Sequence, residues 1–151
     1  MNGGLIAFAV NSMRCALALV LRPLARVTDM TTNSARVLVI DDEAVLRGML
    51  QEMLAAFGYD ADVAANGATG VARFREGTYA TVITDLLMPG MNGLEVVTAL
   101  RTIDPLINII LLTGSAPGLT AARAREMGVT LLQKPIALGD LKAAVDAACK
   151  T

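Results

Sequence analysis

Polar side chains that could take part in chemistry directly follow four short apolar segments of the sequence: Asp41 and Asp42, Asp85, Thr113, and Lys134. Burying an unpaired carboxylate is costly, so an aspartate at the end of a buried segment needs a compensating partner or a functional use. Three carboxylates gathered in one place repel each other, which favours a cation between them. Because the chain has no histidine and these ligands are oxygen atoms, a hard cation such as Mg²⁺ fits them best.

A phosphorylated ligand would complete such a site, because Mg²⁺ is usually held by one or two carboxylates together with phosphate oxygens and water. The ammonium of Lys134 could neutralise charge on a phosphoryl group, and the hydroxyl of Thr113 could donate a hydrogen bond to it. Gly114 follows this threonine and would allow a backbone N–H to approach closely. These residue types therefore indicate a site for magnesium and a phosphoryl group.

The sequence lacks the loop that holds phosphates in many nucleotide-binding proteins, since no segment matches G-x-x-x-x-G-K-[ST]. A carboxylate can instead act as the nucleophile and form an aspartyl-phosphate. Asp85 is the best candidate because it follows the central apolar segment, between the two adjacent aspartates on one side and Thr113 and Lys134 on the other.

Each of these residues also has a simpler structural interpretation. Asp42 or Glu43 could cap a helix, Thr113 could belong to a turn, and Lys134 could be a solvated charge. The combination favours a site, because in open α/β sheets ligands bind beyond the carboxyl ends of the strands, where the strand order reverses.

The elements that must position these residues are short β-strands alternating with helices. Apolar and β-branched runs predict five strands, at residues 36–40, 60–65, 80–84, 107–112 and 129–133. Apolar residues at helical spacing, with glycine or proline after most segments, predict five helices, at residues 43–57, 68–76, 94–103, 119–127 and 139–150. Regular alternation of this kind is typical of a parallel sheet covered by helices on both faces.

Composition excludes several classes of site. Without histidine, the chain cannot form a Ser-His-Asp triad or a histidine-ligated zinc site. Cys15 and Cys149 are far apart and have no metal-binding spacing, which favours reduced thiols and a cytoplasmic location. Residues 35–151 carry a formal charge of −3 without a basic stripe, which argues against direct binding of nucleic acid.

The first 34 residues are treated as an N-terminal extension, separate from a domain at residues 35–151. Their apolar runs, 5–10 and 15–21, are interrupted by polar residues, so an unbroken span of about 20 residues is missing. Two interpretations stay open. Residues 5–26 could form an amphipathic helix on a membrane or partner, interrupted at Pro23, or translation could start at Met30.

Four segments, "VLVIDDE", "ITDLLMPGMNGLEV", "ILLTGS" and "LLQKP", together resemble the receiver domain of bacterial two-component response regulators. They occur in that family's order, and Asp85 lies 43 residues after Asp42, 28 before Thr113 and 49 before Lys134. The resemblance extends from about residue 36 to residue 148. It implies a flavodoxin-like, doubly wound sheet of five parallel strands in the order 2-1-3-4-5 with five helices.

The resemblance also implies roles for the site residues. Asp85 would accept a phosphoryl group from a sensor histidine kinase or a histidine phosphotransfer protein. Mg²⁺ would be bound by the carboxylates of Asp42 and Asp85, by the backbone carbonyl of Leu87, and by Asp41 through water.

In the same family, Thr113 would move toward the phosphoryl group and Lys134 would pair with it. Pro89 and Gly93 would shape the loop after the phosphoacceptor, and a cis peptide bond would precede Pro135.

The sequence departs from the family pattern at two positions. Leu131 occupies the place, three residues before the lysine, where the family normally has an aromatic residue, so coupled movement of threonine and aromatic ring stays open. Gly114 replaces the more usual alanine after the switch threonine.

The expected function is a phosphorylation-dependent signalling switch, not an enzyme, that acts by binding a downstream protein. A second copy of the chain is a further candidate partner. Only Thr151 follows Lys150, so no output domain is expected, and the chain would be a stand-alone receiver, a phosphate relay or a fragment.

Two alternatives remain. One is a receiver-like module that binds partners without phosphorylation. The other is a phosphohydrolase of the haloacid dehalogenase type, although that class has its nucleophile at the end of the first strand and a second aspartate two residues later.

Overall fold

The computed structural model describes residues 35–115 and 118–150. Its strands form one parallel sheet in the order β2-β1-β3-β4-β5, as predicted. The strands are β1 (Arg36–Ile40), β2 (Asp60–Ala64), β3 (Thr81–Asp85), β4 (Asn108–Thr113) and β5 (Thr130–Gln133). The order reverses between β1 and β3, which places a switch point beside the two central strands.

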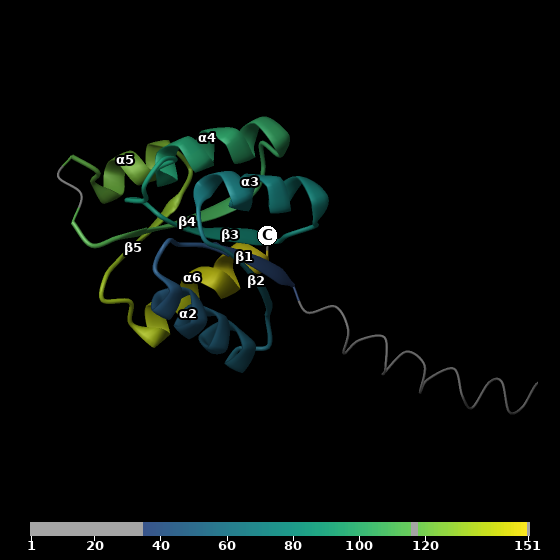
Figure 1. Ribbon diagram of the computed structural model, residues 1–151. Coiled ribbons are helices and arrows are strands. Elements are labelled where there is room, and N and C mark those ends of the chain that lie inside the picture. The colour runs from purple at the N-terminus through teal and green to yellow at the C-terminus, as the bar shows by residue number, and fades with distance from the viewer. Residues whose placement is uncertain (1–34, 116–117, 151) are drawn as a thin grey trace, which may run out of the picture. The chain divides into compact units, whose positions relative to one another are not determined.

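Helices cover both faces of the sheet, with α2 and α6 on one face and α3, α4 and α5 on the other (Figure 1). Their bounds are α2 (Ala44–Ala56), α3 (Gly67–Glu76), α4 (Gly93–Ile103), α5 (Ala121–Glu126) and α6 (Leu138–Cys149). The predicted bounds differ from these by no more than two residues, and the largest difference is at the start of α5, predicted at residue 119. This α/β architecture confirms the predicted fold class.

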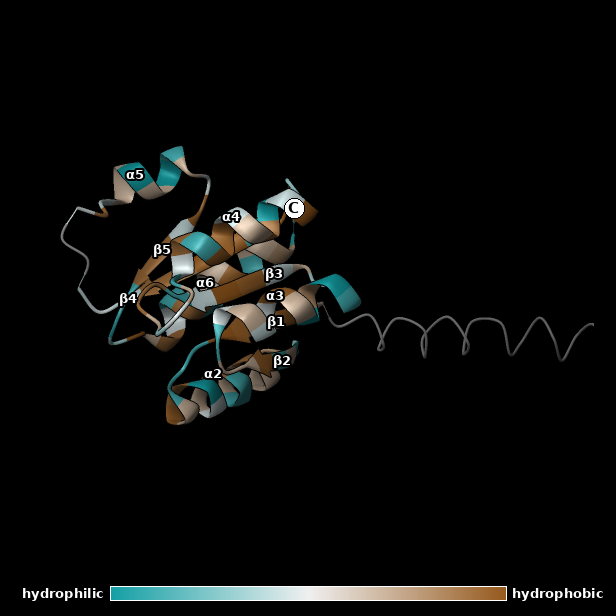
Figure 2. Cartoon of the chain, turned by 45° about the horizontal axis from the view of Figure 1, so that its top comes forward, coloured by the Kyte–Doolittle hydropathy of each residue, from teal (hydrophilic) through white to brown (hydrophobic). Residues whose placement is uncertain are grey.

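The side-chain alternation of the strands divides the core into two layers. Val37 and Val39 pack with α2 and α6, whereas Leu38 and Ile40 pack against α3 and α4 on the opposite face. All four side chains are fully buried. Strands buried on both faces explain why the sequence shows continuous apolar runs here rather than an apolar–polar alternation. Figure 2 shows these hydrophobic strands between the helices.

The predicted cis peptide bond before Pro135 is confirmed. The expectations for residues 1–34 lie outside the described residues. In residues 35–115 and 118–150, no helix combines the length and the apolar character that crossing a membrane requires.

Candidate functional site

Parallel strands bring the predicted site residues to one edge of the sheet. Ile40 is in register with Thr84, so Asp41 and Asp85 follow at the same level on neighbouring strands. Thr113 ends β4 in register with Gln133 of β5, and the N–H of Lys134 donates to the carbonyl of Thr113 over 2.7 Å. The carboxyl ends of β1, β3, β4 and β5 therefore assemble all five side chains that the sequence indicated.

Three carboxylates form the centre of the site. Asp41, Asp42 and Asp85 each offer an oxygen, and these oxygens lie within 4.8 Å of one another. Asp41 is fully buried and Asp85 is 7% exposed, whereas Asp42 is exposed to solvent. Such a group of oxygen ligands, open on one side, fits a hard cation that keeps some of its water.

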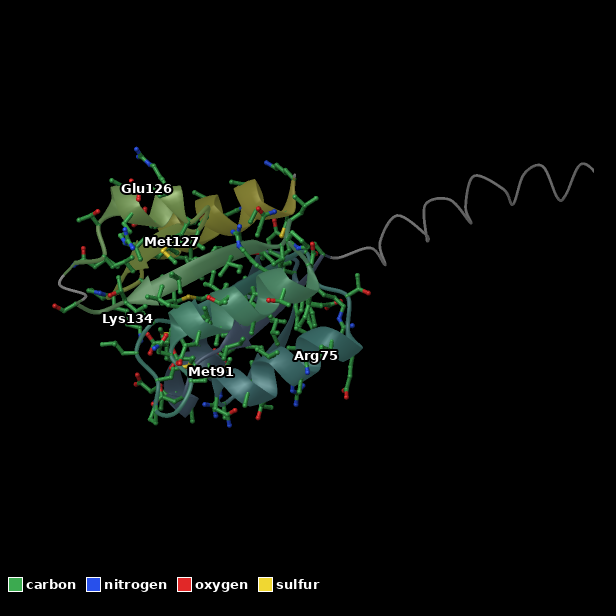
Figure 3. All side chains as sticks on the ribbon, turned by 90° about the horizontal axis from the view of Figure 1, so that it is seen from above. Arg75, Met91, Glu126, Met127 and Lys134 are labelled. Carbon is green, nitrogen blue, oxygen red and sulfur yellow. The ribbon has the colours of Figure 1, made fainter. Side chains whose placement is uncertain are left out.

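Lys134 provides the cationic side chain of the cluster. Its Nζ lies 3.3 Å from Oδ2 of Asp85 and 3.6 Å from Oδ2 of Asp41. One ammonium facing three carboxylates leaves an excess of negative charge. Figure 3 shows Lys134 on the same side as Met91 of the β3–α4 loop, whereas Arg75 lies toward the opposite side.

Burial makes the charge on Asp41 costly. Loss of solvent raises the pKa of this carboxyl above its ordinary value, although the Glu43 N–H that donates to Oδ1 and the charge of Lys134 oppose that shift. The neighbouring carboxylates of Asp85 and Asp42 raise the pKa further. A divalent cation would relieve both the burial and the repulsion.

Two buried oxygens in the site lack hydrogen bonds, although one of them is 3.6 Å from the ammonium of Lys134. Oδ2 of Asp41 and Oγ1 of Thr113 have no hydrogen-bond partner. Buried polar atoms are nearly always paired, so two such atoms at one edge of a sheet need an explanation. A carboxylate oxygen is suited to a metal or its bound water, and a hydroxyl is suited to an anionic oxygen. These residues therefore fit the predicted magnesium ion and phosphoryl group.

The loop after Asp85 is held close to the site by its neighbours. Gly93 donates its N–H to the carbonyl of Leu86 over 2.9 Å, and a Cβ at Gly93 would lie 2.5 Å from the carbonyl oxygen of Asp85. Only glycine permits this approach. Asn92 and Glu95 then begin α4 with a capping box. Leu87 lies within this loop, with its side chain 65% exposed.

The helix-capping interpretation of Asp42 and Glu43 is not what the structure shows. Glu43 occupies the N-cap position of α2 but makes no side-chain capping bond. The first turn is held instead by Asp41, whose Oδ1 accepts from Glu43 N–H over 2.8 Å.

Sequence reasoning missed Arg47, whose Nη1 donates to the main-chain carbonyl of Asp41 over 2.7 Å. Its position after the two aspartates indicates a contact with their turn only when the helix is known to begin at Ala44, because Arg47 then lies in the first helical turn.

A cavity of about 560 Å³ adjoins the loop after Asp85. On the other side of the site, a cleft of about 450 Å³ runs from α2 to Lys134 and the two residues that follow it. The cavity is lined by Leu86 and Leu87, and the cleft by Glu43 and Lys134, so both adjoin residues next to the carboxylates.

The chain resembles known proteins over its described part. Residues 37–146 match the response regulator receiver domain. The DNA-binding response regulator MtrA of Mycobacterium tuberculosis is 34% identical over 119 residues, which are 78% of this chain and 52% of that protein. The DNA-binding transcriptional regulator NtrC of Azospirillum brasilense is 32% identical over 117 residues, 77% of this chain and 24% of that protein. The chain thus spans about a quarter to a half of the length of these curated relatives.

Solved structures show the same fold. A response regulator receiver domain protein from Clostridium thermocellum has a TM-score of 0.72 and 30% identity, covering 77% of this chain and 94% of that one. The chemotaxis protein CheY4 of Vibrio cholerae has a TM-score of 0.70 and 28% identity, covering 76% and 98% of the two chains. The sheet order, the acidic cluster with its lysine, and these similarities lead to one conclusion: the chain belongs to the response regulator receiver domain family, a family of signalling domains.

Proposed function

We propose that residues 35–151 act as a phosphorylation-dependent switch of a two-component phosphorelay, with Asp85 as the phosphoacceptor. The observation that carries this proposal is the juxtaposition of three carboxylates within 4.8 Å of one another with an ammonium 3.3 Å from Asp85. Asp85 is also the member of the cluster that ends the central strand β3, between the other carboxylates and Thr113.

The reaction transfers a phosphoryl group from a phosphohistidine of a sensor kinase or phosphotransfer protein. A carboxylate oxygen of Asp85 forms a bond to phosphorus while the phosphorus–nitrogen bond breaks, and the electron pair of that bond stays on the imidazole, which then takes up a proton. Mg²⁺, when bound, supplies positive charge to the phosphoryl oxygens.

Each neighbouring residue has a defined task in this proposal. When Mg²⁺ is bound, the carboxylates of Asp42 and Asp85 and the carbonyl of Leu87 would hold it, and Asp41 would hold one of its water molecules. Lys134 forms an ion pair with the phosphoryl group, replacing its contact with the Asp85 carboxylate. The unpartnered hydroxyl of Thr113 donates a hydrogen bond to a phosphoryl oxygen.

The donor needs a surface beside the site, and the cleft between α2 and Lys134 provides one. Val45, Met49 and Leu138 are 79%, 42% and 54% exposed, and the first two line this cleft. Exposed apolar side chains grouped near a reactive centre favour a protein partner over solvent. We therefore propose that the phosphoryl donor docks on this side, against the cleft that Lys134 lines.

The downstream partner is expected on the face made by α5, β5 and α6, which Thr113 reaches through the end of β4. Leu131 in β5 is only partly buried and packs against the core on the α5 side. Because leucine stands here, we expect this face to respond to the state of Thr113 without the aromatic ring that the family normally uses.

The test is modification of the wild type by acetyl phosphate with Mg²⁺, followed by borohydride trapping and mass spectrometry. We expect the label on Asp85 and no label in the Asp85→Asn variant. Label at Asp42 would overturn the assignment, and a wild type that stays unmodified would favour the phosphorylation-independent module.

A further inference from the structure

Arg47 of α2 is joined to the acidic cluster by a closed ring of hydrogen bonds. Its Nη1 donates to the carbonyl of Asp41 over 2.7 Å, and its own N–H donates to the carbonyl of Glu43 over 3.0 Å. The N–H of Glu43 returns to Oδ1 of Asp41 over 2.8 Å. The ring contains the whole turn between β1 and α2, in which Asp41 and Asp42 lie.

This contact leaves the carboxylate of Asp41 available. The guanidinium binds the main-chain carbonyl, and the Asp41 N–H is occupied by the carbonyl of Ala64 over 3.2 Å. Oδ1 accepts from Glu43, so only Oδ2 lacks a hydrogen bond. Every polar atom of Asp41 except the one aimed at the cluster is therefore fixed by a neighbour.

The carbonyl that Arg47 holds belongs to the peptide bond between Asp41 and Asp42. A peptide unit is planar, so holding its oxygen fixes the orientation of the whole plane and of the Cα atoms at both ends. Both of those Cα atoms carry carboxylates of the cluster. Asp42 is exposed, so its carboxylate is not held by packing and reaches the cluster from a Cα whose position this plane fixes.

Because of this geometry, we propose that Arg47 is a positioning residue for the divalent cation, acting through the Asp41–Asp42 peptide. This inference rests on the proposed magnesium-dependent function. Residues that orient metal ligands without touching the metal typically affect its affinity by 10- to 100-fold. Arg47 belongs to this class because it is only partly exposed and contacts the ligand-bearing turn through a main-chain carbonyl.

If Arg47 acted through its charge alone, removing it would change the Mg²⁺ affinity in the opposite direction. A guanidinium close to a cation site repels the cation, so its removal would strengthen Mg²⁺ binding. A role through geometry predicts weaker binding after the same removal. The direction of the change in Mg²⁺ affinity therefore separates the two roles.

The experiment measures Mg²⁺ affinity by isothermal titration calorimetry for the wild type, Arg47→Met and Arg47→Lys. Methionine keeps an unbranched apolar side chain and removes every hydrogen-bond donor. Lysine keeps the positive charge and an ammonium group that can donate to the carbonyl of Asp41. Arg101→Met is the matched control. Arg101 also donates to a main-chain carbonyl, that of Gly128, over 2.7 Å. This carbonyl precedes β5, so it lies at the amino ends of the strands, opposite to the acidic cluster.

We expect Arg47→Met to weaken Mg²⁺ binding by about 10-fold or more, Arg47→Lys to lie between it and the wild type, and Arg101→Met to match the wild type. Amide NMR shifts of Asp42 and Glu43 should change in Arg47→Met before metal is added. If Arg47→Met does not fold, a weaker affinity in Arg47→Lys supports the inference and an unchanged one overturns it.

Equal or tighter Mg²⁺ binding in folded Arg47→Met would overturn the inference while leaving the proposed function intact. A wild type without Mg²⁺ affinity would overturn both, and the trapping of a phosphoryl group on Asp85 distinguishes these two failures.

Discussion

The Nζ of Lys134 lies 3.3 Å from Oδ2 of Asp85, in contact with the carboxylate proposed to accept the phosphoryl group. The same ammonium is 3.6 Å from Oδ2 of Asp41, so it bridges two buried carboxylates. Before modification it lowers the repulsion within the cluster, and after modification it faces a group with more negative charge than the carboxylate. Under the proposed function, Lys134 would therefore sense the modification of Asp85.

Replacing Lys134 with methionine should therefore affect the affinity for a phosphoryl mimic and the affinity for Mg²⁺ differently. We expect binding of beryllium fluoride, a phosphoryl mimic, to weaken by about 10- to 100-fold, because a hydrogen bond to a charged group contributes about 1.5–3 kcal/mol. Mg²⁺ affinity should stay the same or rise, since a competing cation has been removed. ¹⁹F NMR and calorimetry measure the two quantities. Loss of both affinities together would instead indicate damage to the fold.

The close approach of α4 to the phosphoacceptor gives a prediction on stability. In Gly93→Ala, the new Cβ would lie 2.5 Å from the carbonyl oxygen of Asp85 and 2.8 Å from Cα of Leu86, so backbone atoms must move. We expect the free energy of unfolding to fall by about 1–3 kcal/mol, as for other overpacked sites. Urea denaturation followed by circular dichroism measures this change.

Gly48→Ala is the matched control for that substitution. Gly48 lies in the interior of α2, and a Cβ there would meet no atom within 4 Å apart from the adjacent backbone of its own helix. Alanine should raise the free energy of unfolding by about 0.5–1 kcal/mol, because it reduces the freedom of the unfolded chain in a helical position. If the free energy of unfolding changes in the same direction in Gly93→Ala and Gly48→Ala, the tight packing assigned to the β3–α4 loop is contradicted.

Most of the fold could be predicted because β1, β3 and β4 are buried on both faces and appear as apolar runs in the sequence. The grouping of Asp41, Asp85 and Lys134 followed from the rule that parallel strands end at one edge. Arg47 could not be predicted in the same way, since its role depends on a side-chain direction within one helical turn. The environment of Tyr59 was equally hidden, because its partner lies 87 residues away.

That distant partner gives Tyr59 an unusual titration. Its hydroxyl donates to Oδ1 of Asp146 over 2.6 Å, and this hydrogen bond, with partial burial, raises the pKa of Tyr59 to about 12. A raised pKa in the folded state favours the protonated form, so the contribution to stability is complete below the ordinary pKa near 10. It is lost as the pH rises from about 10 to about 12.

Absorbance at 295 nm follows this ionisation. We expect the folded wild type to show a tyrosine transition near pH 12 that Tyr59→Phe lacks. Asp146→Asn should move the transition toward ordinary values, because the hydrogen bond to Asp146 is the largest cause of the shift. A transition that stays in place in Asp146→Asn would contradict this explanation.

The unpartnered hydroxyl of Thr113 predicts a conflict between stability and function. Oγ1 is buried without a hydrogen bond, and the residue is only 6% exposed. Valine has the same shape without the hydroxyl, and removing an unsatisfied buried polar group is neutral or stabilising. Thr113→Val should therefore raise the free energy of unfolding by up to about 1 kcal/mol in the absence of a phosphoryl mimic.

The same substitution should weaken beryllium fluoride binding by about 10-fold, because one donor to the anionic oxygens is lost. Thr113→Ser keeps the donor and removes a methyl group, so it should lose stability and retain the affinity. We expect denaturation to rank Thr113→Val as the more stable variant and ¹⁹F NMR to rank Thr113→Ser as the tighter binder of beryllium fluoride. If valine binds the mimic as well as serine does, then the hydroxyl has no part in holding the phosphoryl group, and the orphaned oxygen of Thr113 needs another explanation.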